Sequence, residues 1–411
     1  MLEYQWIEWR LPMETLQTIY KIGLGPSSSH TMAIEYICLD VLKHYPNNTY
    51  KVILYASLAL TGQGHFTDQV IKRTLKNVKI EYNYEEEVDH PNTMDVLVMD
   101  GENLVETIRY KSVGGGHFLK EGDTLVKNHV YPHENLEDIK AYCKEEGIDL
   151  LTYIKRFEDE TLLPHIRHVW QVMQETIETG LEKRGVLPGQ LRVKRKAKSL
   201  YDYVVKVEDK EETDFKELMS YAYATSEMNA CGGRVVTAPT CGASGVLPAV
   251  LYFLKRKHHL EDDQIIDGLM VAGLIGTLIR HNASISGAVA GCQAEIGSAC
   301  SMAAAARGII FHHPTETIEY AAEMAMEHHL GLTCDPILGY VQIPCIERNA
   351  MAAVRAIDAS RLSYMIPDSQ SISFDTVIET MYQTGKDLTS SYRETSLGGL
   401  ASFYRKQKER L

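Results

Sequence analysis

The stretch Ser284–Arg307 consists largely of alanine, glycine and serine, and it constrains the fold more than any other part of the chain. Side chains this small let helices pack closely, so we expect the segment at the crowded centre of a helical domain. Helical patterns rich in Ala, Leu, Met and Glu surround it. They cover residues 161–183, 264–280, 296–311, 315–330, 349–360 and 374–387. Residues 156–411 are therefore predicted to form an all-α domain.

The first 155 residues have a different, mixed character. Tyr50–Leu58 and Asp95–Met99 are short β-branched runs that predict strands, whereas His30–Tyr45 has apolar residues at helical spacing. The three glycines at 114–116 predict a turn or a close backbone approach. We therefore expect a multi-domain chain, with an α+β domain over residues 1–155 ahead of the all-α domain over 156–411.

Charge and hydropathy exclude several classes of protein. Lys and Arg number 42 against 55 Asp and Glu, so the chain is acidic and a poor candidate for binding nucleic acid or an anionic membrane. The one dense basic run, Arg192–Lys198, reads as a solvated linker or helix face. Glu3 and Glu8 interrupt the N-terminal apolar residues, which argues against a secretion signal. Apolar runs such as Leu269–Ile279 are shorter than the roughly 18 residues that a membrane span needs. A cytoplasmic location is predicted, and there the eight cysteines stay reduced.

Two short segments in the first domain carry residues suited to chemistry. Gly25–Thr31 (GPSSSHT) gathers hydroxyls just before a helical pattern, which suits a carboxylate or phosphate; alternatively, one serine caps the helix and the others are exposed. Thr61–Asp68 places His65 on a glycine-rich loop after a strand pattern. This histidine is a candidate general base or acid, because its pKa lies near working pH, or it is an ordinary surface residue.

A second glycine-rich segment, Ala230–Pro248, leads into a helical pattern over Ala249–Lys257. Its glycines could form an anion-binding nest, and Arg234 could pair with a carboxylate through its planar guanidinium. A plain interhelical loop is the alternative. The segment contains neither the Gly-Lys-Ser/Thr of a P-loop nor the GxGxxG of a dinucleotide fold.

The cysteines are the most informative residues. Cys334 and Cys345 lie eleven residues apart on a segment that follows no helical period. Two thiols on one irregular loop could bind a metal or a cubane iron–sulfur cluster, or they are simply structural. The spacing disfavours zinc. A cluster needs a third thiol, and Cys292 and Cys300 would be roughly 12 Å apart on one straight helix. Cys300 precedes an alanine run and is expected to pack, whereas Cys292 lies among glycines.

Taken together, these segments resemble the iron–sulfur-dependent L-serine dehydratases (L-serine ammonia-lyases) of the single-chain type. The matching stretches span nearly the whole chain in the family's order, and the CDP…GYVQIPCIERN block is highly specific. They are GPSSSHT at 25–31, GHFTD at 64–68, GGRVVTAPT at 232–240, NASISGA at 282–288, GCQAEIGSACSMAAA at 291–305, HHLGLTCDPILGYVQIPCIERNA at 328–350 and RETSLGGLA at 393–401.

The resemblance implies a fold, a cofactor and a reaction. The α+β domain would be similar to the allosteric substrate-binding domains of amino-acid enzymes, and the all-α domain would be catalytic. A [4Fe-4S] cluster would be held by Cys292, Cys334 and Cys345, with one iron open to the substrate. The implied reaction converts L-serine to pyruvate and ammonia, and it would lose activity in air. The family also implies a homodimer.

The proposed roles of the remaining residues follow the matching motifs. His65 is our preferred base. Arg234 and Asn282 are weaker candidates for contacting the substrate or the cluster's surroundings. The residues expected to orient the substrate's carboxylate and amine are Ser27, Ser28, Ser29, His30 and Thr31.

The chain departs from the family pattern at three places. Cys241 stands where many relatives have Asn, which leaves polar contacts there in doubt. Phe66 replaces the glycine that usually follows GH, and it is expected to stiffen or narrow the loop at His65. The chain ends in RKQKERL, without the terminal cysteine that some single-chain members place in the site.

Three other functions remain alternatives. One is a cluster-dependent lyase acting on L-cysteine or L-threonine. Another is a non-enzymatic sensor of amino acids or oxygen. A pyridoxal-phosphate dehydratase is disfavoured, because the segments 230–248 and 282–310 contain no lysine for a Schiff base.

Overall fold

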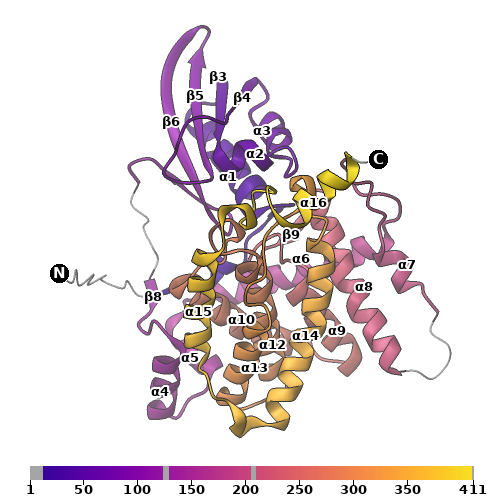
Figure 1. Ribbon diagram of the computed structural model, residues 1–411. Helices are drawn as coiled ribbons and strands as arrows, with labels where there is room; N and C mark the ends of the chain where they lie inside the picture. Colours follow the sequence, from indigo (N-terminus) through magenta and orange to yellow (C-terminus); the bar gives the residue numbers. More distant parts are fainter. Residues whose placement is uncertain (1–12, 124–128, 205–209, 410–411) are drawn as a thin grey trace, which may run out of the picture.

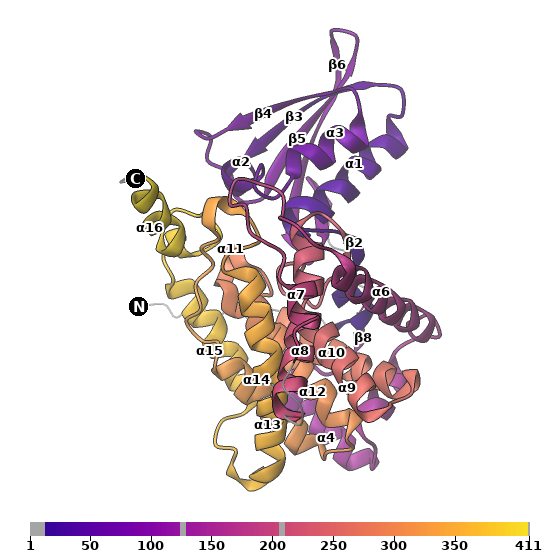
Figure 2. The ribbon, with the colours of Figure 1, turned by 90° about the vertical axis from the view of Figure 1, so that its right-hand side faces the viewer.

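The computed structural model describes residues 13–123, 129–204 and 210–409 (Figure 1). A sheet-containing body sits on one end of a larger helical body, and the two are clearly separate in both ribbon views (Figure 2). The strands are β1 Met13–Glu14, β2 Ile22–Leu24, β3 Thr49–Tyr55, β4 Val78–Asn83, β5 Thr93–Asp100, β6 Asn103–Gly114, β7 His117–Lys120, β8 His129–Tyr131 and β9 Arg234–Val236. Residues 1–12, on which the argument against a secretion signal rests in part, lie outside the described residues.

Helices make up most of the rest of the chain. Up to residue 258 they are α1 Ala33–His44, α2 Ala56–Thr61, α3 Thr67–Leu75, α4 Leu136–Glu146, α5 Leu150–Phe157, α6 Leu162–Glu182, α7 Ala197–Tyr201, α8 Lys210–Ala230 and α9 Val246–His258. After it they are α10 Asp262–Asn282, α11 Gly287–Ala290, α12 Ser298–Ile310, α13 Thr315–Glu327, α14 Cys345–Met365, α15 Phe374–Asp387 and α16 Gly399–Lys408. The helices expected over 161–183 and 374–387 are confirmed as α6 and α15.

The sheet body is a five-stranded sheet with helices on one face. Its strand order is β4-β3-β5-β6-β7, with only β3 and β4 parallel. A parallel pair needs a crossover, which α2 and α3 provide. The inward side chains of α1, β3 and β5 form a core of their own. The strand predicted over Tyr50–Leu58 is confirmed up to Tyr55, where Ala56 takes a φ of 40° and the chain turns into α2.

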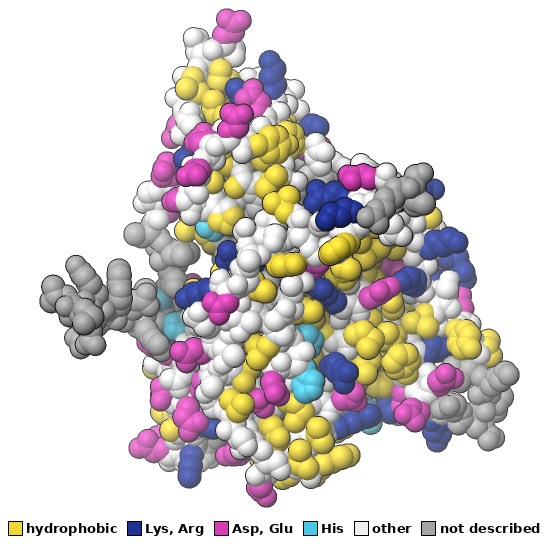
Figure 3. Space-filling view, in the orientation of Figure 1, with side chains coloured by type: hydrophobic (Ala, Val, Ile, Leu, Met, Phe, Trp, Pro, Cys, Tyr) yellow, Lys and Arg dark blue, Asp and Glu magenta, His cyan; other side chains and the backbone are white. Residues whose placement is uncertain are grey.

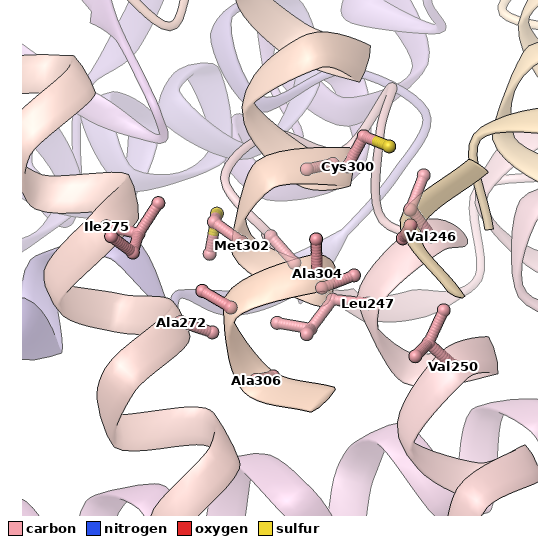
Figure 4. Packing of buried hydrophobic residues seen from close by; sticks show 14 of the residues in the cluster. Val246, Leu247, Val250, Ala272, Ile275, Cys300, Met302, Ala304 and Ala306 are labelled. Atoms are coloured by element: carbon pink, nitrogen blue, oxygen red, sulfur yellow. The ribbon is translucent and has the colours of Figure 1, made fainter. Parts of the chain in front are cut away.

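The helical body is built around α12. This helix is buried along nearly its whole length and packs against α9, α10, α13 and α14. Figure 4 shows its Met302, Ala304 and Ala306 facing Ala272 and Ile275 of α10 and the apolar side chains of α9. The expectation that the alanine-rich segment lies at the centre of a helical body is confirmed.

One short strand, β9, corrects the expectation of an all-α domain after residue 155. β9 pairs with β2 in antiparallel fashion, with Val235 and Val236 buried. The pairing is fixed by Thr237 Oγ1, which donates to Ile19 O at 2.6 Å. The larger body is therefore mostly helical, and the β2–β9 ladder leads the chain from it toward the GPSSSHT segment.

The hydrophobic cores show which segments pack together. Side chains of residues 13–20 and of α4 and α5 join the core of the helical body, whereas residues 34–110 supply the core of the sheet body. A domain division at residue 155 stays a prediction. In the described part of the chain, no helix is both long enough and apolar enough to span a membrane.

Candidate active site

Three cysteines from three separate segments meet at the end of the helical body that faces the sheet. Cys292 follows Gly291, whose φ of 76° turns the chain into a π-helical turn over Gln293–Gly297. Cys334 forms an isolated bridge with Arg393, and its amide donates to Tyr392 O at 2.8 Å. Cys345 is the first residue of α14. The thiols of Cys292 and Cys334 are hydrogen-bonded to one another, and Cys345 feels the charge of Cys292.

The electrostatics of the three thiols differ. The interaction of Cys292 with the Cys334 side chain lowers the pKa of Cys292, and the Arg348 guanidinium lowers this pKa further. The same interaction raises the pKa of Cys334, while burial raises the pKa of Cys345. Metal binding requires thiolates, whose negative charges burial disfavours. A bound cation would stabilise these charges.

Arg348 is the cation nearest to this cluster of sulfurs. Its charge acts on all three thiols. Its Nη1 donates to Thr333 O at 2.6 Å, and its Nη2 lies 3.7 Å from Asp335 Oδ1. Asp335 in turn accepts a hydrogen bond from the amide of Leu400 at 2.6 Å. The arginine thus ties the cysteine loop to the C-terminal segment.

Two buried acidic residues complete this region. Glu295 accepts a hydrogen bond from Thr240 Oγ1 at 2.7 Å and lies 3.9 Å from Cys334 Sγ, and burial raises its pKa. Burial likewise raises the pKa of Glu394, whose backbone has a φ of 56° and whose amide donates to Cys334 O at 2.8 Å.

Sequence reasoning missed these three charged residues, although each lies inside a motif that it had singled out. Glu295 follows Cys292 by three positions and Arg348 follows Cys345 by three, which is the spacing of neighbours on one helical face. Glu394 belongs to the RETS stretch. The spacing alone could have identified Glu295 and Arg348, because both follow a candidate ligand within one turn.

The backbone approaches the sulfurs closely at Gly287. A Cβ there would lie 3.0 Å from Cys334 Sγ and 2.7 Å from Glu295 Oε2, so only glycine lets the chain pass this close to them. Three thiols with a neighbouring guanidinium fit an iron–sulfur cluster. Within the described ranges, no group of three His, Cys, Asp or Glu side chains is arranged to hold a single metal ion. A cubane cluster is a different case, because each thiolate binds a different iron.

His65 reaches this region from the sheet body. It is fully buried, which contradicts the surface alternative. Its Nδ1 donates to Thr61 O at 3.1 Å, so Nε2 carries the lone pair; Nε2 has no hydrogen-bond partner and lies 3.8 Å from Glu394 Oε1. A Cβ at Gly64 would lie 2.7 Å from the backbone of Gly339, so the His65 loop rests directly on the loop between Cys334 and Cys345.

The GPSSSHT segment contacts His65 through His30 and Thr31. Ser27 accepts a hydrogen bond from the His30 amide at 3.1 Å and so caps the turn, which is the first half of the alternative interpretation. The other residues are buried, so the alternative with exposed hydroxyls is wrong. His30 Nδ1 lies 2.9 Å from Ser29 Oγ, and its ring centroid lies 4.5 Å from that of His65. Thr31 Oγ1 donates to His65 O at 2.7 Å, which fixes the catalytic candidate's backbone.

The other residues considered in the sequence analysis lie away from the three cysteines or make structural contacts. The side chain of Arg234 is exposed on β9. Asn282 Nδ2 donates to Glu134 O at 2.7 Å and to Leu278 O at 3.1 Å. Cys241 is fully buried, and Phe66 has a φ of 59° in the region that favours glycine. Cys300 packs in α12 and donates to Ala352 O, as expected.

We expect the buried His65 to make the protein less stable in acid. Burial lowers its pKa from 6.5 to about 4. The unfolded chain therefore binds the proton first, so the histidine's contribution is fully present above pH 6.5 and is lost as the pH falls toward 4. That contribution is about 3 kcal/mol. In H65Q, the free energy of unfolding should fall less steeply between these pH values, as measured by urea unfolding.

The comparison is made with the wild type, in which His30 and Glu394 face His65. Identical slopes for wild type and H65Q would contradict the assignment of a depressed pKa to His65.

The chain matches known proteins over most of its length, including all the residues of the candidate site. The family model for the serine dehydratase alpha chain matches residues 51–401, and that for the beta chain matches residues 15–83. L-serine dehydratase 2 of Escherichia coli is 40% identical, covering 93% of this chain and 97% of the relative. L-serine dehydratase of Haemophilus influenzae is also 40% identical with the same coverage, and that of Streptomyces coelicolor is 36% identical.

Proposed function

This chain belongs to the L-serine dehydratase family, a family of carbon–nitrogen lyases, and we propose that it converts L-serine to pyruvate and ammonia with a [4Fe-4S] cluster held by Cys292, Cys334 and Cys345. The observation that carries this proposal is the meeting of three thiols from distant segments in one place, beside the Arg348 guanidinium. Glycine at position 287 lets the backbone approach Cys334 Sγ without a side chain that would clash with it.

A cluster bound through three thiolates offers one iron as a Lewis acid for the departing hydroxyl group. The remaining task is removal of the weakly acidic proton on the serine α-carbon. We assign it to His65 Nε2, because this atom has a lone pair and no competing hydrogen bond. Its pKa of about 4 keeps the ring neutral, and hence able to accept a proton, over the working range. Glu394 Oε1, 3.8 Å from Nε2, is positioned to accept a hydrogen bond from the imidazolium that results.

The residues around His65 would orient the substrate. We propose that the hydroxyls and ring of the GPSSSHT segment position the carboxylate and amine of serine, with backbone positions already fixed by the contacts among Ser27, Ser29 and His30. The enamine that follows dehydration tautomerises and hydrolyses without help from the protein. Arg234 and Asn282 play no part in this scheme, because the former is exposed and the latter donates to backbone carbonyls.

The proposed function is tested by anaerobic purification, followed by iron and sulfide counts and an assay of pyruvate release. We expect four irons per chain, an absorption change on adding L-serine, and faster turnover of L-serine than of L-threonine or L-cysteine. Faster release of pyruvate from L-cysteine would favour the related lyase. A full cluster without turnover of any of the three would favour a sensor. Loss of activity in air, a homodimer and a cytoplasmic location are predictions that accompany this proposal.

A further inference from the structure

Five basic side chains line a cavity of about 300 Å³ on the surface of the helical body. We call it the basic pocket, and its cations are Lys183, Arg184, Lys194, Arg195 and Lys198. Figure 3 shows Lys and Arg side chains gathered at the right-hand edge, over the position that α7 has in Figure 1. The chain as a whole has a net charge of −13, so this concentration of positive charge is local.

The backbone brings these cations together by doubling back between α6 and α7. The amide of Leu187 donates to Val193 O at 2.8 Å, and the amide of Arg195 donates to Gly185 O at 2.9 Å. Gly185 has a φ of 100°, a conformation that side chains disfavour, and it allows the chain to reverse directly after α6. Arg192–Lys198, the basic run expected to be a solvated linker or helix face, is thus folded against the end of α6.

Acidic residues neutralise only part of this charge. Asp202 pairs with Arg184 at 2.6 Å and with Lys198 at 2.8 Å. Lys183 and Lys194 take part in no ion pair among the described residues. Arg195 is only 10% exposed; its Nη2 donates to Cys231 Sγ, but its Nη1 has no hydrogen-bond partner and lies 3.8 Å from Glu227 Oε2. The cavity therefore retains an excess of positive charge and an unused buried donor.

We propose that the basic pocket binds the diphosphate or triphosphate group of a small metabolite. A single carboxylate would leave most of the cations unused, whereas a multivalent phosphate can engage Arg184 and the lysines together. The cavity is at the small end of ligand pockets, which suits one compact anion. The acidic surface elsewhere disfavours a long nucleic acid.

The basic pocket also adjoins the loop that carries the cysteines. Pro188 O accepts a hydrogen bond from Gln342 Nε2 at 2.8 Å, and Lys196 pairs with Glu347 at 2.6 Å. A Cβ at Gly189 would lie 2.6 Å from the Tyr340 ring. An anion held by Lys194 and Arg195 would thus bind to the segment that packs on residues 340–347.

The test is isothermal titration calorimetry of the full-length protein with inorganic pyrophosphate, ADP and orthophosphate. We expect one pyrophosphate site per chain, weaker binding of orthophosphate, and a steep loss of affinity with added salt. The variant K183Q/K194Q should bind pyrophosphate about tenfold more weakly or worse. Both lysines are exposed, so their replacement should leave the melting temperature unchanged.

The matched control is K43Q/K79Q, which removes two exposed lysines from the sheet body and changes the net charge equally. It should bind pyrophosphate as the wild type does. Tighter binding of ADP than of pyrophosphate would identify a nucleotide as the source of the phosphate group, and equal binding would identify the phosphate chain alone. Equal affinities of the two double variants would overturn the proposal. So would the absence of saturable pyrophosphate binding, or binding of an RNA oligonucleotide in its place.

Discussion

Replacing Cys334 by alanine is expected to remove the iron–sulfur cluster and the dehydratase activity together. The Cys334 sulfur interacts with the Cys292 thiol and lies 3.9 Å from Glu295 Oε2. With two thiolates left, a cubane cluster would lack one of its three protein ligands. Iron and sulfide counts on anaerobically purified C334A should fall to near background, and pyruvate release from L-serine should fall with them.

The matched control is C38A, because Cys38 is fully buried in the core of the sheet body, away from the other thiols. It should retain its iron and its turnover. Titration of free thiols in the folded protein gives a second readout that does not depend on activity, since loss of the cluster from C334A leaves Cys292 and Cys345 free to react. Equal iron contents in C334A and wild type would refute the ligand assignment.

Replacing His65 by asparagine is expected to leave the cluster in place while reducing kcat by about two to four orders of magnitude. Among the described residues the imidazole makes no hydrogen bond to a cysteine, and its Nε2 atom is the unpaired acceptor on the side of Glu394. The substitution removes the proposed proton acceptor but leaves every residue of the helical body unchanged. The measurements are iron content, the absorption spectrum, and kcat and KM for L-serine.

H133N is the appropriate control for this variant, because His133 packs against Tyr142 and Tyr153 within the helical body. Its turnover should match that of the wild type. Exchange of the α-deuteron of labelled serine separates proton removal from the later steps. Wild-type turnover by H65N would remove His65 as the base, and loss of iron from H65N would show a structural role.

Local patterns were sufficient for much of the helical body. The predicted helix over 374–387 has the bounds of α15, and the alanine-rich segment lies at the centre of the core as α12. Both predictions rest on periodicity and side-chain size, which act over a few residues. The prediction for Tyr50–Leu58 was wrong at its end, because the turn at Ala56 depends on packing of α2 against the sheet rather than on β-propensity.

The sites of pairing between distant segments could not be predicted in the same way. β9 exists because Arg234–Val236 meets Ile22–Leu24, some two hundred residues earlier in the chain. Likewise, Glu394 is brought to the site by the backbone contact of its segment with Cys334. The candidate ligands and His65 were found because each lies in a recognisable motif. The burial of His65 and the proximity of Arg348 to all three thiols emerge only from the tertiary structure.

The contact between Gly64 and Gly339 has a consequence for how samples of this enzyme should be judged. His65 lies on the loop between α2 and α3, whose buried side chains belong to the core of the sheet body, whereas Cys292 and Cys334 belong to the core of the helical body. A rotation of one body against the other would alter the spacing of base and leaving group while both cores stay intact. Misalignment of an ångström or so is enough to slow a reaction severely. A sample can therefore contain all of its iron and unfold at the wild-type temperature and still be inactive.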